Sequence, residues 1–151
     1  MRLAIGADHA GYEMKDTLVR RLRAAGHEVI DLGTCDDEPV DYPDYAKAVG
    51  EAVRSGQAER GILLCGSGAG VAVAANKMKG IRAALCHDAY TAHQSVEHDN
   101  ANVLCLGPRV IGPELAKDLV TIWLRAEFNG EERHVRRLAK VDEIERMEAS
   151  K

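Results

Sequence analysis

Short apolar runs alternate with segments of helical periodicity along most of the chain. The runs show little polar alternation, which is typical of strands in a parallel sheet that is covered on both faces. We predict five such strands, over residues 2–6, 28–32, 61–65, 81–85 and 103–106. Each strand is followed by a segment whose apolar residues recur every three or four positions, or that is apolar almost throughout. These segments predict helices over residues 12–25, 43–55, 70–78, 89–98 and 113–126.

Residues at the ends of several predicted helices support these boundaries. Gly26 suits the position after a helix C-terminus, where a left-handed backbone is common. Pro43 suits the first turn of a helix, because its missing N–H would have no helical partner there. Asp88 can accept a hydrogen bond from the free amides at the start of the following helix.

The five alternations of strand and helix predict a doubly wound α/β fold. We expect a Rossmann-like, five-stranded parallel sheet in the order 2-1-3-4-5, with right-handed crossovers that place helices on both faces. Residues 129–151 predict one extra helix with no strand after it, which can cover its own domain or reach a neighbouring subunit. Its apolar stripe consists of Leu138, Val141, Ile144 and Met147. The chain of 151 residues is expected to form a single domain, residues 1–151.

The composition argues against several classes of partner. A net charge of −4 provides no general attraction to nucleic acid or to anionic membranes, and no apolar run approaches the roughly 20 residues of a membrane span. The chain enters its first strand at once, so we expect no signal peptide. Widely spaced cysteines favour free thiols in a reducing, cytoplasmic setting. They are Cys35, Cys65, Cys86 and Cys105.

The most informative stretch is the glycine-rich turn after the third predicted strand. It runs Cys65-Gly66-Ser67-Gly68-Ala69-Gly70, and a helix that begins near Gly70 would direct its free amides and positive dipole end toward the turn. A thiol and a hydroxyl beside those amides indicate a small anion site that contains a nucleophile or a base. The turn fits neither the dinucleotide fingerprint nor the Walker loop, and Cys65 taken alone is also compatible with an inert buried thiol.

Other polar residues follow the strands of the predicted sheet. Asp8 and His9 come after the first strand, His87 after the fourth and Arg109 after the fifth. Ligands of doubly wound folds bind at the carboxyl ends of the strands, near the point where the strand order reverses. The first and third strands flank that point, so we expect Asp8 and His9 to face the glycine turn. For His87 we expect an ordinary surface or packing role.

Nine short motifs occur in a fixed order over nearly the whole chain. In the first half they are Gly6-Ala-Asp8-His9-Ala-Gly11, Asp41-Tyr42-Pro43, Cys65-Gly-Ser67-Gly-Ala-Gly70 and Ala74-Ala-Asn76-Lys77. In the second half they are Gly80-Ile-Arg82-Ala, Glu97-His98, Asn102-Val-Leu, Gly107-x-Arg109-Val-Ile-Gly112 and Arg133-His134-x-x-Arg137. No single motif is decisive, but the set closely resembles the ribose-5-phosphate isomerase B family, which also includes the galactose-6-phosphate isomerase subunits.

The resemblance implies an aldose–ketose isomerase of the pentose phosphate pathway that interconverts ribose 5-phosphate and ribulose 5-phosphate through a cis-enediolate, without a metal or cofactor. By resemblance, Cys65 is the base that moves the proton between C1 and C2. Ser67 would orient the substrate hydroxyls, His98 would open the sugar ring, and Asp8 would bind sugar hydroxyls and relay protons. The turn amides that would hold the enediolate belong to Gly66, Gly68, Ala69 and Gly70.

The resemblance also implies a phosphate site that two chains share. His9, Arg133 and Arg137 would hold the phosphate, with Arg109 as a further contact, because the planar fork of arginine donates two hydrogen bonds. Tyr42 would contact the substrate. The family is typically dimeric, and the resemblance leaves the choice between a dimer and a tetramer undecided. The C-terminal helix would then carry its two arginines to the pocket of the neighbouring chain.

Two positions depart from the family pattern. Some members use a glutamate just past the glycine turn, where this chain has Val71, so Cys65 is the only candidate for the base. Asp99 stands where the family usually has asparagine, and an extra carboxylate near the substrate leaves the exact sugar open. Two alternatives therefore remain: an isomerase of the same superfamily acting on a hexose 6-phosphate or an unphosphorylated aldose, and a non-catalytic phosphosugar-binding module.

Overall fold

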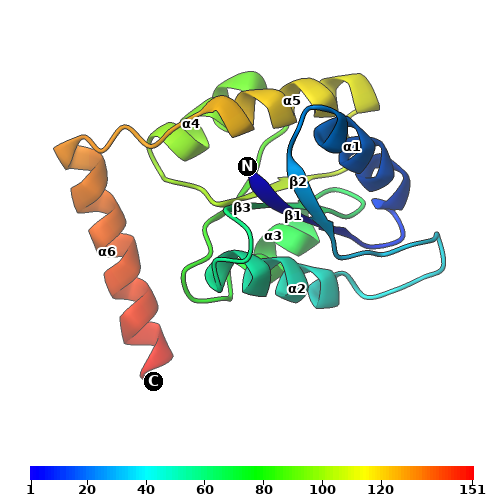
Figure 1. The fold of residues 1–151 in the computed structure, drawn as a ribbon. Helices are drawn as coiled ribbons and strands as arrows, with labels where there is room; N and C mark the ends of the chain where they lie inside the picture. Colours follow the sequence, from blue (N-terminus) through cyan, green and yellow to red (C-terminus); the bar gives the residue numbers. More distant parts are fainter.

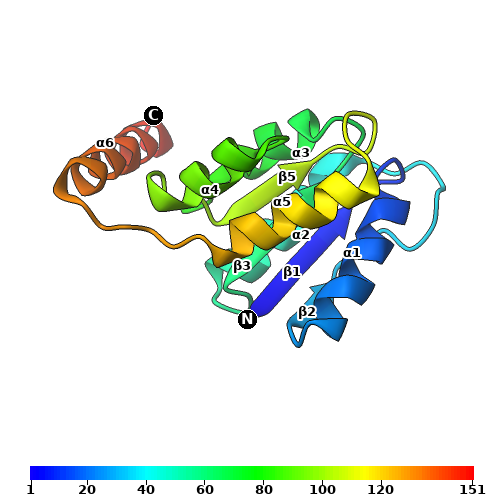
Figure 2. The ribbon, with the colours of Figure 1, turned by 90° about the horizontal axis from the view of Figure 1, so that it is seen from above.

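A parallel five-stranded sheet forms the middle layer of the molecule, and helices cover both of its faces (Figure 1, Figure 2). The computed structural model describes all residues, Met1–Lys151. The strands are β1 (Arg2–Ala7), β2 (Glu28–Asp31), β3 (Arg60–Leu64), β4 (Ala83–Leu85) and β5 (Val103–Leu106). Every pairing between neighbouring strands is parallel, which confirms the fold class predicted from the apolar runs.

The strand order is β2-β1-β3-β5-β4, so the predicted order 2-1-3-4-5 is wrong at its far end. β5 pairs with β3, and β4 occupies the edge of the sheet. The burial of the two strands accounts for this arrangement. Every residue of β5 is buried, whereas all three residues of β4 are at least partly exposed, and an interior strand must be apolar on both faces. The observed order brings the turn after β5 next to the turn after β3.

Helices on the two faces of the sheet bury two separate apolar cores. On one face lie α1 (Tyr12–Ala24), α4 (Ala89–Glu97) and α5 (Pro113–Arg125), and on the other lie α2 (Tyr42–Arg54) and α3 (Ala69–Ala75) (Figure 1). Leu3 and Ile5 of β1 belong to the larger core, and Ala4 between them belongs to the smaller one. Since side chains alternate along a strand, this division confirms that both faces are covered.

Most helix ends follow the signals in the sequence. Gly26 has a φ of +91° just after α1, Pro43 lies in the first turn of α2, and Asp88 Oδ1 accepts a hydrogen bond from Thr91 N at 2.7 Å at the start of α4. α3 departs from the prediction, because it ends at Ala75 and Val73 in its middle is 63% exposed. An apolar sequence therefore leaves one side of α3 without a partner in the chain.

The last helix, α6 (Glu132–Ala149), projects from the body of the molecule instead of covering the sheet (Figure 1, Figure 2). His134 is its only buried residue. Much of its predicted apolar stripe is unpartnered, because Val141, Ile144 and Met147 are between 49% and 62% exposed. None of the helices combines the length and the apolarity that crossing a membrane requires.

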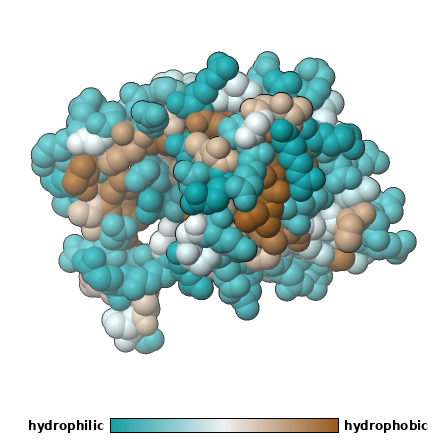
Figure 3. Space-filling model, viewed as in Figure 1, coloured by the Kyte–Doolittle hydropathy of each residue, from teal (hydrophilic) through white to brown (hydrophobic).

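A cavity of about 730 Å³ lies between α6 and the body. Ile81 and Arg82 line it from the body, and Leu138 and Val141 line it from α6. A hydrogen bond from the main chain of the body to a side chain of α6 bridges the two parts, since Gly80 N donates to Glu145 Oε1 at 2.9 Å. Hydrophilic residues cover most of the face seen in Figure 3, and separate hydrophobic patches interrupt it.

Candidate active site

The carboxyl edge of the sheet collects the polar residues that follow β1, β3 and β5. Asp8 directly follows β1 and is buried, and its Oδ1 accepts hydrogen bonds from Ala10 N at 3.0 Å and Gly11 N at 3.2 Å. Asp8 N donates to Leu64 O at 3.1 Å, so the loop after β1 starts beside the end of β3. The structure thus brings Asp8 next to the strand that leads into Cys65.

The glycine-rich turn begins directly after β3. Cys65 is buried and belongs to the smaller core. Gly68 has a φ of +81°, a conformation that glycine adopts without strain, and α3 starts at the next residue. Ser67 Oγ accepts a hydrogen bond from Ala69 N at 3.2 Å. The sharp turn places a thiol, a hydroxyl and several main-chain amides in one short segment.

The turn after β5 packs against the glycine turn, as a consequence of the observed strand order. A Cβ on Gly107 would overlap the carbonyl carbon of Ser67, so only glycine fits there. Arg109 N donates to Gly66 O at 3.0 Å. The Arg109 guanidinium lies over Gly66, where an added Cβ would come within 3.0 Å of Nη1. A permanent positive charge beside the turn favours an anion at this place.

Tyr42, the first residue of α2, packs against the start of α3. A Cβ on Gly70 would lie 2.7 Å from Tyr42 Cε1, so the aromatic ring rests on the backbone of the glycine-rich segment. The partly buried ring belongs to the border of the smaller core. Tyr42 therefore lies at the same edge of the sheet as Cys65.

Two histidines at this edge accept hydrogen bonds from main-chain amides. Val40 N donates to His9 Nδ1 at 3.2 Å, and Gly107 N donates to His87 Nε2 at 3.0 Å. A nitrogen that accepts carries no proton, so the proton of the neutral ring lies on Nε2 in His9 and on Nδ1 in His87. Burial lowers the pKa of His87, which favours the neutral ring. His87 thus supports the turn that carries Arg109.

The remaining candidate residues lie at the opposite, amino edge of the sheet. α4 starts after β4 at the carboxyl edge and runs back across the sheet, so His98 and Asp99 follow its far end. α5 runs in the same direction, and the linker after it carries α6 to that edge, where Asn129 N donates to Glu97 O at 3.1 Å. Within one chain, the structure therefore separates His98, Asp99 and the arginines of α6 from the Cys65 group.

His98 is the centre of a second polar cluster at the amino edge. Its ring stacks on His134 of α6, with the ring centroids 4.1 Å apart and an angle of 18° between the planes. Gln94 Nε2 lies 3.2 Å from His98 Nδ1. Burial, together with the nearby His98 and Arg133, lowers the pKa of His134, and Arg133 forms an ion pair with Glu131. No role for His134 was predicted from the sequence; its place between Arg133 and Arg137 in one motif was the only signal.

The carboxyl-edge group can bind an anion and move a proton. An ionised thiol acts as a base or nucleophile, and amides with a neighbouring guanidinium stabilise a negative oxygen. Burial raises the pKa of the Cys86 and Cys105 thiols, which keeps both as protonated core groups. No three His, Cys, Asp or Glu side chains gather as metal ligands would.

The fold and this edge define a class: a doubly wound α/β protein with a thiol and an amide turn where the strand order reverses. A family model described as Ribose/Galactose Isomerase matches residues 3–141. Ribose-5-phosphate isomerase B of Escherichia coli is 46% identical over 144 residues, which cover 95% of this chain and 96% of that one. D-erythrulose-4-phosphate isomerase of Pectobacterium atrosepticum is also 46% identical, over 132 residues and 86% of each chain.

Solved structures agree with these relatives. Ribose-5-phosphate isomerase B of Clostridium thermocellum superposes with a TM-score of 0.96 at 51% identity, over 97% of this chain and 99% of that one. The enzyme of the same name from Mycoplasma genitalium, solved with bound ribulose-5-phosphate, has a TM-score of 0.90 at 39% identity over 96% of each chain. The chain belongs to the ribose/galactose isomerase family, as its motifs indicated. Relatives of equal identity are named for different sugars, so membership leaves the sugar open.

Proposed function

We propose that this protein is an aldose–ketose isomerase that interconverts ribose 5-phosphate and ribulose 5-phosphate without a metal or cofactor. The observation that carries the proposal is the Cys65 thiol at the start of a glycine turn, with the Arg109 guanidinium over that turn. Isomerisation needs a base for a carbon-bound proton and donors for the oxygen that becomes negative. One short segment supplies both requirements, and the relatives named ribose-5-phosphate isomerase B support the same reaction.

In the proposed reaction, the ionised thiol of Cys65 removes the proton from C2 of the open-chain aldose. The electron pair left behind forms the C1–C2 double bond of the enediolate, and negative charge develops on O1. The amides of residues 66–70 and the Arg109 guanidinium stabilise that oxygen. Cys65 then returns the proton to C1, and the O2 proton moves to O1 with Asp8 and Ser67 as the relay, which gives the ketose.

We further propose that two chains of a homodimer build each site. His98, assigned to ring opening, and Arg133 and Arg137, assigned to the phosphate, lie at the edge opposite Cys65. The four residues of β5 alone span about 13 Å between the two edges, which is too far for one pentose phosphate to reach both groups in one chain. A second chain whose amino-edge cluster faces the carboxyl edge of the first would complete the set.

Two unpartnered apolar surfaces support such a dimer. One is the exposed stripe of α6. The other surrounds the carboxyl edge of the sheet. Its exposed residues are Val73, Leu85, Tyr90 and Val110. Leu85 ends β4, and the other three lie on the segments that follow β3, β4 and β5. Contact between these surfaces on two chains would remove apolar area from water at both sites of a symmetric pair, which favours association.

The test of the reaction is isomerisation of ribose 5-phosphate by the purified protein in excess EDTA. The panel beside it contains D-erythrulose 4-phosphate, galactose 6-phosphate and free ribose. Strong turnover of ribose 5-phosphate in EDTA is the expected result. Faster turnover of another sugar would keep the chemistry and change the substrate. No turnover of any sugar would contradict the isomerase and leave a phosphosugar-binding module.

A second candidate substrate is a tetrulose 4-phosphate. The relative named D-erythrulose-4-phosphate isomerase is as similar to this chain as the Escherichia coli ribose-5-phosphate isomerase B, and Asp99 adds a carboxylate to the amino-edge cluster. The ratio of kcat/KM for the two sugars, measured in the unsubstituted protein and in Asp99→Asn, separates the two candidates. A ratio that does not respond to the substitution would show that Asp99 does not select the sugar.

A further inference from the structure

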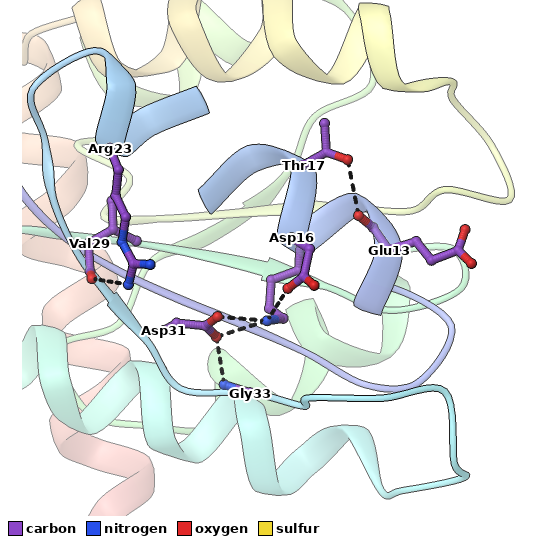
Figure 4. Close-up of polar contacts among 8 residues, drawn as sticks. Glu13, Asp16, Thr17, Arg23, Val29, Asp31 and Gly33 are labelled. Carbon is purple, nitrogen blue, oxygen red and sulfur yellow. Dashed lines mark hydrogen bonds and ion pairs between the residues drawn. The ribbon is translucent and has the colours of Figure 1, made fainter. Parts of the chain in front are cut away.

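Lys15 of α1 is buried although it carries a charge, with a side chain that is only 1% exposed. Its Nζ lies 2.9 Å from Asp16 Oδ1 and 2.9 Å from both carboxylate oxygens of Asp31, at the end of β2 (Figure 4). Burial alone would lower the pKa of Lys15, but the hydrogen bonds to Asp31 and Asp16 raise it above its ordinary value. The ammonium therefore stays charged and paired, as a buried cation must.

Neither carboxylate requires an ion pair with Lys15 in order to stay ionised and solvated. The side chains of Asp16 and Asp31 are 35% and 30% exposed, so water can reach them without an ion pair. The buried ammonium, by contrast, needs these carboxylates, because a buried charge left without its partner is strongly destabilising. The two hydrogen bonds from Lys15 Nζ to Asp31 also hold that carboxylate in one place.

Asp31 also restrains the main chain of the loop that follows β2, through a hydrogen bond. Asp31 Oδ1 accepts a hydrogen bond from Gly33 N at 3.0 Å (Figure 4). Gly33 O in turn accepts from Ala7 N at 2.6 Å, and Thr34 N donates to Ala7 O at 2.7 Å. The pairing of β1 with the chain after β2 thus continues to the last residue before Asp8.

The far end of the same loop contacts His9. Val40 N donates to His9 Nδ1 at 3.2 Å, which leaves the proton of the neutral ring on Nε2. The ring therefore presents a donor to a group bound beside it. A donor suits a phosphate group, whose ionised oxygens accept hydrogen bonds. The loop, restrained at Gly33 and touching His9 at Val40, selects the tautomer that can bind an anion without a change in ring charge.

We propose that Lys15 and Asp31 are positioning residues for phosphate binding at His9. Their ion pair fixes the start of the loop at Gly33, the loop keeps Val40 N on His9 Nδ1, and the ring keeps its Nε2–H available to the phosphate. Neither Lys15 nor Asp31 touches the ligand. The identity of the ligand as a sugar phosphate rests on the proposed function, whereas the tautomer of His9 does not.

The test monitors the His9 ring by ¹⁵N NMR in the unliganded protein at a pH where the ring is neutral. Lys15→Met removes the charge and keeps an unbranched apolar stem, and Asp31→Ala removes the acceptor of Gly33 N. We expect one Nε2-protonated tautomer in the unsubstituted protein and a mixture of tautomers in both variants. Lys15→Arg, which keeps a cation, should restore the single tautomer. The signal of His9 is identified by its loss in His9→Gln.

Lys117→Met is the matched control, because it removes a helical lysine whose Nζ lies 2.9 Å from Glu114 on α5. This control should leave the His9 spectrum unchanged. In turnover of ribose 5-phosphate, Lys15→Met should raise KM about tenfold with little change in kcat, the effect of weakening one hydrogen bond to a charged group.

A His9 tautomer that stays unchanged in the folded variants overturns the proposal, and so does an equal change in Lys117→Met. If Lys15→Met does not fold, the tautomer of His9 in Asp31→Ala alone tests the proposal. The NMR experiment needs no substrate. Absence of turnover in the unsubstituted protein would therefore refute the proposed function and leave the result on His9 intact.

Discussion

Cys65 and Cys105 are buried thiols on neighbouring strand segments, and their local surroundings differ. Cys65 leads into the glycine turn, whereas Cys105 lies inside β5, where burial raises the pKa of its thiol far above the ordinary range. We predict that Cys65→Ala lowers kcat for ribose 5-phosphate by about 10²- to 10⁴-fold, the usual contribution of a general base. Cys105→Ala should keep kcat close to that of the unsubstituted protein.

Both cysteine variants should retain the circular dichroism spectrum of the native fold, and Cys65→Ala should still bind substrate by calorimetry. These measurements separate loss of a base from loss of structure. Near-normal turnover by Cys65→Ala would remove Cys65 from the role of base, and an equal loss in Cys105→Ala would show that packing, not chemistry, is responsible.

Gly107 shows how closely the turns after β3 and β5 approach each other. A methyl group there would overlap the backbone of Ser67, whereas Gly112 has nothing within 4 Å of an added Cβ. We predict that Gly107→Ala lowers the free energy of unfolding by about 1–3 kcal/mol, as overpacking does, and lowers activity because Arg109 is displaced. Gly112→Ala should lose less stability in urea denaturation, only about 0.5–1 kcal/mol, the cost of alanine at the N-cap of α5. Equal stability of the two variants would show that the turns separate easily.

At the scale of elements, the sequence predicted what local patterning determines and missed what depends on distant partners. All five strands and the helices after them were predicted, because apolar runs and cap residues such as Asp88 act within a few positions. The order of β4 and β5 depends on which strand is buried on both faces in the finished sheet, and the strand residues 83–85 and 103–106 are all apolar. The proximity of Arg109 to Gly66 follows from that order, so it could not be predicted from local patterning either.

The stack of His98 on His134 joins α6 to the body, and its strength should depend on pH. Since the pKa of His134 is lowered in the folded protein, folding favours the neutral ring. The stabilisation is complete above the ordinary value of 6.5 and is lost as the pH falls through the lower folded value. A protonated His134 would face His98, Arg133 and Arg137, with Glu131 as the only nearby compensating charge.

We therefore predict that α6 detaches more readily in acid. Amide hydrogen exchange, corrected for its intrinsic pH dependence, should show less protection of α6 at about pH 5 than at about pH 8, on either side of the ordinary titration of histidine. His134→Phe keeps an aromatic ring without a titrating group and should remove this difference. The same pH dependence in His134→Phe would assign the effect to other groups.

At the scale of the whole molecule, the sequence predicted part of the arrangement of the candidate residues, since Asp8 and His9 were expected beside the glycine turn. The sequence placed Asp8, His9 and Cys65 after strands, and parallel strands must bring such residues to one edge. Nothing in the local pattern shows where a terminal helix lies once its linker leaves α5. The structure shows α6 standing away from the sheet with its apolar stripe largely uncovered, and this feature supports the proposed two-chain site.

The distance between Cys65 and Arg137 allows a direct test of sharing. Cys65→Ala and Arg137→Ala should each be nearly inactive at ribose 5-phosphate concentrations below KM, the first through loss of the base and the second through loss of a phosphate contact. If each site takes Cys65 from one chain and Arg137 from the other, a heterodimer of the two variants contains one site with both native residues. After subunit exchange in equal amounts, activity should recover to about a quarter of the native value, because half of the symmetric dimers are then mixed.

The control uses Arg136→Ala in place of Arg137→Ala. The Arg136 side chain pairs with Glu132 on the same helix. Arg136→Ala should be active alone, which shows that truncating an arginine of α6 does not by itself prevent dimer formation. If the two residues instead act within one chain, every site in the Cys65→Ala and Arg137→Ala mixture lacks one of them. Activity would then stay at the average of the separate variants, although mass spectrometry would show that heterodimers had formed. This outcome would refute the two-chain site and would leave the isomerase reaction itself unaffected.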